Sequence, residues 1–350
     1  MSLQTTTIGA YPKPDYVPTP DWFRTGGTGN EAPTKAFDAF LKNLPDDIDK
    51  IHDRATYEVI QDQVNAGIDI PTDGEIRREN YIHYQCRNFE GFDFSNLTKL
   101  VLRNGAWVAE VPTIVGPIRA RDPILPHDYL VAQAATNHPV KITLPGPMTI
   151  AGSTADDYYH DEAKLGADLA KALNQEVLAL AEAGCTWIQI DEPVFARQPE
   201  QALAYGFENL ERCFDGLPDH VTRVVHMCCG YPDRVDQEDF QKADQRAYFQ
   251  LADAIEASTI AAVSLEDAHR HNDLALLEKF NKTTVIFGSI GIARSRVETV
   301  EEIATRLAQA LDHIDGERLI VAPDCGLGML DRETVLAKLR KMVAAVREVS

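Results

Sequence analysis

The stretch DEAKLGADLAKALNQEVLALAEAGCTWIQIDEP, residues 161–193, carries the clearest indication of the fold. Apolar residues recur at helical spacing over residues 161–184, and a glycine follows, as it does after many helices. The run TWIQIDEP (186–193) is apolar and β-branched, and it stops at acidic residues and a proline, as strands commonly do. The stretch therefore predicts a helix that leads directly into a buried strand.

The same alternation extends along the chain, with further helical patterns at residues 297–315 and 331–349. Eight strand-like runs are found: TTTIGAYP (5–12), IDIPTDGE (68–75), VKITLPGP (140–147), TWIQIDEP (186–193), RVVHMCCG (223–230), TIAAVSLE (259–266), TVIFGSIG (284–291) and RLIVAPDCG (318–326). The runs are nearly continuously apolar, as expected when both faces of a sheet are covered. Eight β-α units predict an α/β fold, a (β/α)8 TIM barrel. A doubly wound open sheet is the alternative, but no Gly-rich strand-turn-helix fingerprint supports it.

Residues 76–122 interrupt this alternation with irregular, aromatic sequence such as EGFDFSNLTKL. We interpret them as an insertion in the loop after the second strand, forming a β-hairpin lid. The whole chain, residues 1–350, is then expected to be a single domain that contains this insertion.

Composition and charge exclude several classes of protein. The apolar content of 44% and charged content of 25% are ordinary for a globular protein. A formal charge of −20 disfavours binding to nucleic acid or to anionic membrane surfaces. No apolar stretch approaches the roughly 18 residues needed to span a bilayer, and the N-terminus does not resemble a signal peptide. Six scattered cysteines are unlike a disulfide framework, so we expect a cytoplasmic protein with reduced thiols.

Reactive side chains recur where the strand-like runs end. Barrel active sites form at the C-terminal ends of the strands, from residues contributed by several of them. Cysteines or carboxylates with purely structural roles would have no reason to favour that face. The residues at these ends are Glu75, Asp191, Glu192, His226, Cys228, Glu266 and Cys325.

The segment HMCC (226–229) gives the most specific chemical signal. His226 and Cys228 alternate with Met227, so on a strand they point to one side and Cys229 to the other. One histidine and one cysteine make half of a zinc site. Taken alone, this pattern more often belongs to a packed histidine and a buried thiol than to a metal site. Barrel closure would bring the sixth and eighth strands, ending in SLE (264–266) and PDCGL (323–327), around the same mouth.

The motifs HMC, SLE and PDCGL, in this order, resemble the zinc-binding motifs of the cobalamin-independent methionine synthase family. TTTIGAYP resembles its first-strand signature, and PTDGEIRRENY, LPGPMTIA and QIDEP resemble three further motifs. The similarity runs from about residue 6 to residue 326. It corresponds only to the C-terminal, catalytic barrel of the long members, so the chain resembles a short, single-barrel member.

The resemblance implies a methionine synthase, which transfers a methyl group to the zinc-bound thiolate of L-homocysteine. It implies that a zinc ion (Zn2+) is ligated by His226, Cys228, Glu266 and Cys325. It also implies that Glu75 and Asp191 are the catalytic-site acids that hold the homocysteine ammonium. Ile8, Gly9 and Ala10 match the segment that lies along homocysteine, with Ala10 in place of a serine.

The methyl-donor residues depart from the family pattern. Ser153 lies where the long enzymes continue to a pterin-packing tryptophan, and Arg197 replaces a pterin-contacting acid. Ala293 occupies about the position at which the family has a proton-donating histidine. The insertion also reads EVPTIVGP, without the Arg-Cys pair that contacts folate. Methyl transfer from a folate amine needs a general acid, whereas a methyl-corrinoid does not. We therefore expect a methyl-corrinoid or another small donor in place of methyl-folate, with a donor-delivering protein as a possible partner.

Several alternatives stay open at this point. His269, His271 or Asp267 could replace the missing acid, which would restore the standard 5-methyltetrahydropteroyl(tri)glutamate–homocysteine methyltransferase. A methylcobalamin:thiol methyltransferase of the uroporphyrinogen-decarboxylase superfamily shares the barrel, H-x-C and a late cysteine, but lacks the acids of DGE and QIDEP. Betaine-type homocysteine methyltransferases have a different cysteine order. A zinc-stabilised binding module would leave those acids without a purpose.

Overall fold

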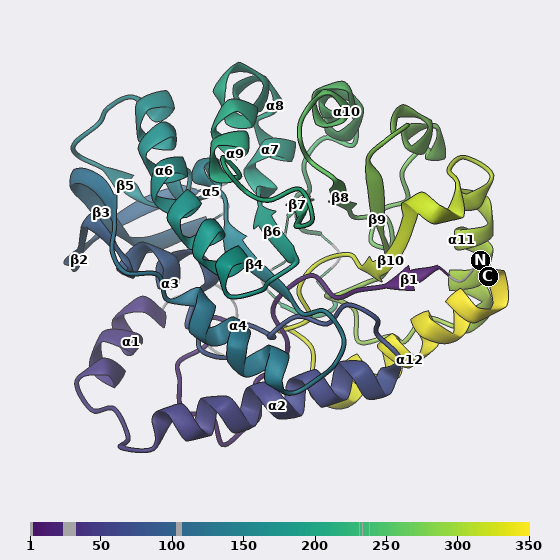
Figure 1. Ribbon diagram of the computed structural model, residues 1–350, viewed down its shortest axis with the longest axis horizontal. Helices are drawn as coiled ribbons and strands as arrows, with labels where there is room; N and C mark the ends of the chain where they lie inside the picture. Colours follow the sequence, from purple (N-terminus) through teal and green to yellow (C-terminus); the bar gives the residue numbers. More distant parts are fainter. Residues whose placement is uncertain (1–2, 24–32, 103–106, 231, 233, 238) are drawn as a thin grey trace.

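The computed structural model describes residues 3–23, 33–102, 107–230, 232, 234–237 and 239–350. Within these residues, seven parallel strands form one sheet in the order β1-β10-β9-β8-β7-β6-β4, and the sheet curls inside a ring of helices (Figure 1). These strands are β1 (Gln4–Thr5), β4 (Lys141–Pro145), β6 (Trp187–Asp191), β7 (Thr222–Met227), β8 (Ala262–Leu265), β9 (Thr284–Ile290) and β10 (Leu319–Pro323). The chain thus has an α/β fold with a curled parallel sheet.

The predicted strand at residues 68–75 is present only as two isolated parallel bridges. Ile70 bridges Thr6, next to β1, and Thr72 bridges Lys141 of β4. The segment therefore lies between the two outer strands of the sheet. Pro71 has no N–H to donate, which limits the ladder that this segment can form. Every other predicted run overlaps a strand of the sheet, although β1 is only 2 residues long and shares one residue with its run.

The helices occupy the segments between the strands. They are α1 (Pro33–Leu41), α2 (Ile48–Ala66), α3 (Tyr81–Arg87), α4 (Leu125–Ala134), α5 (Pro147–Ala151), α6 (Glu162–Glu182), α7 (Pro193–Arg197), α8 (Pro199–Gln201), α9 (Phe207–Cys213), α10 (Ala247–Ala257), α11 (Val300–Leu311) and α12 (Arg332–Val349). A π-helical turn, η2 (Ala202–Gly206), and two 3-10 turns, η3 (Leu274–Lys279) and η4 (Gly316–Arg318), complete the set. None of the described helices combines the length and apolar character needed to cross a membrane.

The three helices expected from sequence periodicity begin at side-chain caps. The Asp161 side chain accepts a hydrogen bond from Lys164 N–H at the start of α6, and Asp331 caps α12 in the same way. Thr299 and Glu302 form a reciprocal capping box at the start of α11. Each cap satisfies backbone donors that have no partner within the helix, and is worth about 0.5–2 kcal/mol. Local sequence therefore fixes where these helices begin.

The insertion at residues 76–122 contains α3 and two long antiparallel strands, β2 (Phe89–Leu102) and β3 (Trp107–Ala120). A short strand, β5 (Ala155–Asp156), pairs in parallel with β3 to complete a separate three-stranded sheet. The hairpin lies to one side of the curled sheet (Figure 1). Residues 103–106 of the insertion lie outside the described residues.

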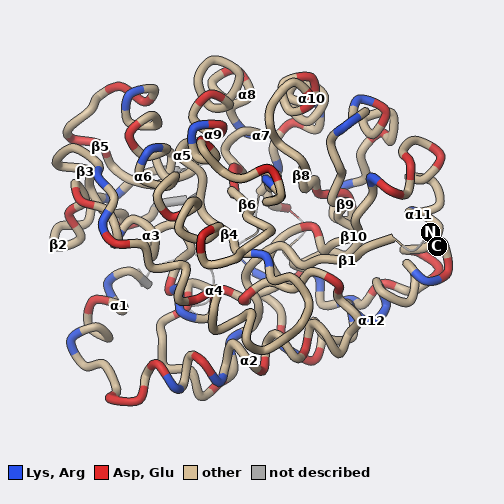
Figure 2. Tube along the Cα trace, viewed as in Figure 1, with Lys and Arg blue, Asp and Glu red and all other residues tan. Residues whose placement is uncertain are grey.

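Apolar side chains cover both faces of the curled sheet. The large core cluster packs the outer face of the sheet against the helices. A smaller cluster gathers alternate residues of several strands, namely Ile8, Val224, Ala262, Ile286, Ile320 and Ala322. Because strand side chains alternate, His226 points to the same face as Val224, one step nearer the C-terminal end of β7. Figure 2 shows acidic and basic residues interspersed along the surrounding helices.

Candidate functional site

A cavity of about 480 Å³ opens at the C-terminal ends of the strands. The hairpin of the insertion contributes to its wall through Val101, Ala109 and Val111. Most of the side chains singled out from sequence line this one cavity. They are Ile8, Gly9, Ala10, Glu75, Asp191, His226, Cys228 and Cys325.

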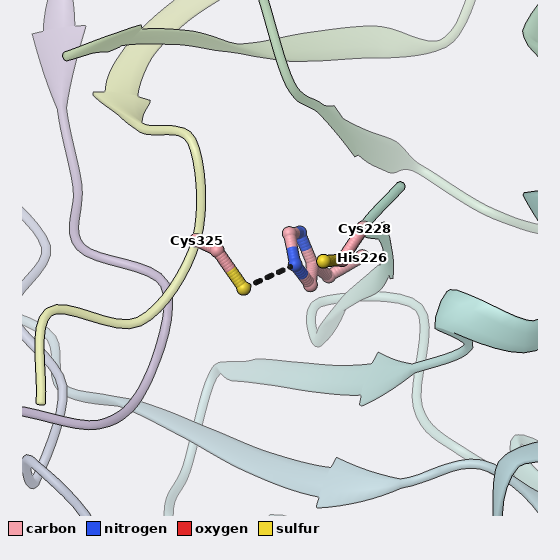
Figure 3. A group of neighbouring side chains, drawn as sticks. All are labelled: His226, Cys228 and Cys325. Atoms are coloured by element: carbon pink, nitrogen blue, oxygen red, sulfur yellow. Dashed lines mark hydrogen bonds between the residues drawn. The ribbon is translucent and has the colours of Figure 1, made fainter. Parts of the chain in front are cut away.

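His226, Cys228 and Cys325 form a compact group in which the three ligand atoms lie within 4.8 Å of one another (Figure 3). His226 Nε2 lies 3.2 Å from Cys325 Sγ, so this ring nitrogen faces the group. The other ring nitrogen, Nδ1, lies 2.9 Å from the Ser264 hydroxyl on β8. A partner of this kind orients a ligating imidazole. β7 thus supplies the histidine ligand, the residue directly after β7 supplies one cysteine, and the segment after β10 supplies the other.

The two sulfurs of the group differ in how tightly they hold a proton. A hydrogen bond from the Cys325 thiol is the main reason that the pKa of Cys228 lies well below its usual value. The same hydrogen bond, together with burial, raises the pKa of Cys325. Cys228 Sγ also accepts a hydrogen bond from Gly230 N–H at 3.3 Å. One sulfur is thus stabilised as a thiolate, which is the form that ligates metals.

Glu266, the fourth ligand expected from sequence, is not part of this group. It is buried directly after β8, and its Oε2 accepts a hydrogen bond from Lys242 Nζ at 2.6 Å. Lys242 lies between β7 and α10, and the sequence contains no motif that would have indicated it. The structure therefore brings three of the four expected ligands together and pairs the fourth with a lysine.

Glu75 and Asp191 are buried carboxyl groups on the cavity wall. Glu75 has a positive φ of 57°, and its Oε1 accepts a hydrogen bond from the Thr143 hydroxyl at 2.8 Å. Asp191 Oδ1 accepts from the neutral amide of Gln189 at 2.7 Å. Burial raises the pKa of Glu75, and it raises the pKa of Asp191 to about 7. A cationic group that entered the cavity would stabilise both carboxyl groups in their charged forms.

The segment Ile8–Ala10 packs closely against Glu75. A Cβ atom at Gly9 would lie 2.7 Å from Glu75 Oε1, so a larger residue here would displace the carboxylate. Ala10 is held on its other side by the segment after β10, because Leu327 N–H donates to Ala10 O at 2.7 Å. These contacts fix the first segment of the sheet beside the carboxylate.

The residues considered for the methyl-donor side are dispersed. Ser153 and Arg197 line the cavity, whereas Ala293 is buried and is not among the lining residues. His269 Nε2 accepts hydrogen bonds from the N–H groups of Ile292 and Ala293, at 3.1 and 3.3 Å. Burial lowers the pKa of His269 to about 3. His269 is therefore held as a neutral hydrogen-bond acceptor, which is the opposite of what a general acid requires.

The other two residues considered as substitute acids are also poorly placed. Asp267 accepts two hydrogen bonds from the Arg306 guanidinium, at 2.7 and 2.9 Å. His271 is exposed to solvent. Neither is among the residues that line the cavity.

Sequence reasoning missed several residues of the cavity wall. Trp22 comes from the segment before α1, and Asn80, Tyr81 and His83 come from the start of α3. His83 Nδ1 lies 2.6 Å from the Thr34 hydroxyl, and burial lowers the pKa of His83 to about 4. Asn80 and Tyr81 end the motif PTDGEIRRENY, which is the only signal in the sequence that could have indicated them.

The family described as "Cobalamin-independent synthase, Catalytic domain" matches residues 3–348. The chain belongs to this family. The resemblance inferred from the ordered motifs is therefore confirmed, and the match extends to both ends of the curled sheet. Proteins of this family named methionine synthase include one from Saccharolobus solfataricus, 30% identical over 350 residues, covering 99% of this chain and 95% of the relative. Another, from Pyrococcus abyssi, is 30% identical over 347 residues, with coverage of 99% and 92%.

Solved structures agree with this family assignment. The structure of a B12-independent methionine synthase from Shewanella sp. W3-18-1 in complex with selenomethionine matches with a TM-score of 0.87 and 30% identity. The match covers 100% of this chain and 98% of the Shewanella chain. A putative vitamin-B12 independent methionine synthase from Listeria monocytogenes matches at 20% identity with a TM-score of 0.69, and this match supports the fold alone.

Proposed function

We propose that this chain is a zinc-dependent methionine synthase, which methylates the sulfur of L-homocysteine to form L-methionine. The observation that carries the proposal is the single cavity in which His226, Cys228 and Cys325 converge beside the buried carboxyl groups of Glu75 and Asp191. The first set suits a metal that binds sulfur, and the second suits an ammonium group. Relatives across the family carry the name methionine synthase, and the Shewanella protein binds a selenium analogue of methionine.

The donor set fits zinc. One imidazole nitrogen and two cysteine sulfurs are ligands that zinc accepts in tetrahedral sites, and Glu266 is the fourth ligand of the proposal. Bound there, zinc would keep a thiol substrate deprotonated and therefore nucleophilic at neutral pH. The chain's own contribution is to orient His226 through Ser264 and to hold Cys228 as a thiolate.

Glu75 and Asp191 would select an amino-acid thiol over a simple one. Each raised pKa shows that ionising the carboxyl group costs free energy in the buried site. An incoming ammonium group offsets this cost and gains charge-assisted hydrogen bonds. Because Gly9 packs on Glu75, the carboxylate is held in place before the substrate arrives. A homocysteine held by this carboxylate would have its sulfur in a fixed position, which lowers the entropic cost of aligning the sulfur with the methyl group.

The methyl donor of the proposal is a corrinoid, a corrinoid protein or another small donor, and not methyltetrahydrofolate. A folate leaving group requires a proton, and general acids contribute about 10²–10⁴ in rate. His269, one of the substitutes considered, accepts backbone hydrogen bonds, and burial lowers its pKa to about 3. Ser153 and Arg197 stand where the long enzymes contact the pterin, which further supports a different donor.

The architectural part of the proposal is a closed (β/α)8 barrel forming a single domain. Residues 68–75 would serve as its second strand, because the bridges at Ile70 and Thr72 link β1 to β4. The insertion at residues 76–122 would act as a lid, since its hairpin helps to wall the cavity. All six cysteines are free thiols, which suits the proposed cytoplasmic location.

Metal analysis and a thiol competition test the proposal together. Purified protein should contain about one zinc per chain, with two sulfur ligands detectable by X-ray absorption. In a methylation assay, homocysteine should be preferred over 3-mercaptopropionate, which lacks the ammonium group. Equal activity with both thiols would favour a methyltransferase for another thiol. The absence of tightly bound metal would overturn the proposal.

A further inference from the structure

We propose that Lys242 is a positioning residue that competes with the metal for the Glu266 carboxylate. In this inference, which rests on the proposed function, Glu266 has two alternative partners. It ligates the metal, or it pairs with the Lys242 ammonium when the substrate sulfur takes its place. Lys242 would therefore set how readily the site exchanges one ligand for another.

The Lys242–Glu266 pair is short and shielded from water. Nζ lies 2.6 Å from Oε2, and the two side chains are only 10% and 5% exposed. The ammonium group also lies 5.2 Å from the centre of the Phe240 ring, a separation at which a cation–π interaction is favourable. Buried pairs of this kind are screened little by solvent, so each partner strongly stabilises the charge of the other.

The backbone around Lys242 is attached to the segment that carries the metal ligands. Ala243 N–H donates to Cys229 O at 2.8 Å. A Cβ atom at Gly230 would lie 3.3 Å from Gln241 O, so the two segments pack closely at this point. Main-chain contacts thus hold the Lys242 segment beside Cys229 and Gly230, and the placement of Lys242 does not depend on the ion pair alone.

Glu266 lies outside the group of three converging ligand atoms, but its segment adjoins that group. It follows Ser264 by two residues at the end of β8, and Ser264 contacts His226. An unpaired carboxylate buried at this position would be costly, because no water replaces the lost hydration. The carboxylate therefore needs a cation in either position, and Lys242 is the cation that the chain itself supplies.

This arrangement has a consequence for substrate exchange. Without Lys242, a carboxylate displaced by homocysteine would be left buried and unpaired, so displacement would be unfavourable. With Lys242, the displaced carboxylate gains a charge-assisted hydrogen bond, and the exchange comes closer to balance. Lys242 should thus weaken metal binding in the absence of substrate and strengthen homocysteine binding.

The experiment compares the full-length wild-type protein with Lys242→Met and Lys242→Gln. The zinc dissociation constant is measured by competition with a chromophoric chelator, and homocysteine binding to the zinc-loaded protein by calorimetry. Either substitution should tighten zinc binding and weaken homocysteine binding, each by at least about tenfold, as loss of one charge-assisted hydrogen bond predicts. X-ray absorption should show that homocysteine removes an oxygen ligand from the wild type but not from the variants.

Matched controls separate this role from a structural one. Lys338→Met breaks another buried lysine–glutamate pair, Lys338 Nζ to Glu298 Oε2 at 2.8 Å, and should leave both constants unchanged. Lys242→Arg keeps the charge and should restore both constants toward wild type. In a Glu266→Ala background, Lys242→Met should no longer change the zinc constant, because the residue acts through Glu266.

Two results would overturn the inference while leaving the proposed function intact. One is a wild-type protein that binds zinc and homocysteine, with both constants unchanged in Lys242→Met and Lys242→Gln. The other is a zinc dissociation constant that Lys242→Met changes just as much in the Glu266→Ala background. This result would show that the lysine acts on the metal through the electrostatic field of its charge and not through Glu266. A wild-type protein without zinc would overturn the proposed function, and the inference with it.

Discussion

The buried Asp191 carboxyl group makes homocysteine binding depend on pH. Its pKa is raised to about 7 by burial, so the group is mostly protonated at pH 6 and mostly ionised at pH 8. An ammonium group binds to the ionised form only. With one such group, the ionised fraction falls about tenfold from pH 8 to pH 6, and the dissociation constant rises by about the same factor. The raised pKa of Glu75 acts in the same direction.

Replacing Asp191 by asparagine should remove both the charge and its pH dependence. A charge-assisted hydrogen bond is worth about 1.5–3 kcal/mol, which corresponds to about 10- to 150-fold weaker homocysteine binding at pH 8. The variant should bind homocysteine with a smaller change from pH 6 to pH 8, and the change that remains should come from Glu75 and from the thiol itself. Asparagine keeps the size of the side chain and the position of the Gln189 contact, so a packing defect is not expected.

Calorimetric titration of the zinc-loaded protein measures this effect, with 3-mercaptopropionate as the reference ligand. Both ligands lose a thiol proton on binding to a metal, and 3-mercaptopropionate lacks the ammonium group and is one carbon shorter. The change of their affinity ratio with pH therefore reports on the ammonium group. The ratio should favour homocysteine more strongly at pH 8 than at pH 6, and Asp191→Asn should reduce it. A ratio that is independent of pH and unchanged in the variant would refute Asp191 as the ammonium partner.

Three further predictions concern the metal and the fold. Cys325→Ser should lose most of the bound zinc in metal analysis, whereas Cys213→Ser, which alters a buried thiol outside the ligand group, should retain it. Gly146→Ala should lower the free energy of unfolding by about 1–3 kcal/mol in urea titrations, because the added Cβ clashes with the Glu192 side chain, while Gly116→Ala has room. Burial raises the pKa of Glu192 to about 8, above its value in the unfolded chain. Between these two pKa values the Glu192 carboxyl group is protonated in the native state and ionised in the unfolded state. The free energy of unfolding should therefore fall as pH rises from about 4.5 to 8, less steeply in Glu192→Gln.

The sheet was largely predictable because its strands are buried on both faces. Continuous apolar runs such as VKITLPGP and TWIQIDEP indicate such strands directly, and β4 and β6 lie within them. The run at 68–75 looked similar, but it forms only isolated bridges. Pro71 has no backbone N–H and therefore leaves a gap in the hydrogen bonds to the neighbouring strand. The convergence of His226 and Cys228 followed from the two-residue period of a strand.

The remainder of the site depends on contacts between distant segments. Nothing near Glu266 in the sequence indicates that it pairs with Lys242, because the two meet only through folding. His269 looked like a possible acid, yet the fold directs backbone N–H groups at its ring nitrogen. The cavity residues Trp22 and His83 also come from segments whose position relative to the sheet cannot be inferred from periodicity.

The protein is expected to methylate homocysteine from a donor other than folate. The most direct measurement is a side-by-side assay of the zinc-loaded protein with homocysteine and one of three donors: methylcobalamin, methyltetrahydrofolate or its triglutamate. We expect methionine to form with methylcobalamin, and rates with both folates to be lower by about 10²–10⁴, since no general acid serves the leaving nitrogen. Turnover with the triglutamate at ordinary enzymatic rates, of about 1 s⁻¹ or more, would contradict a donor other than folate.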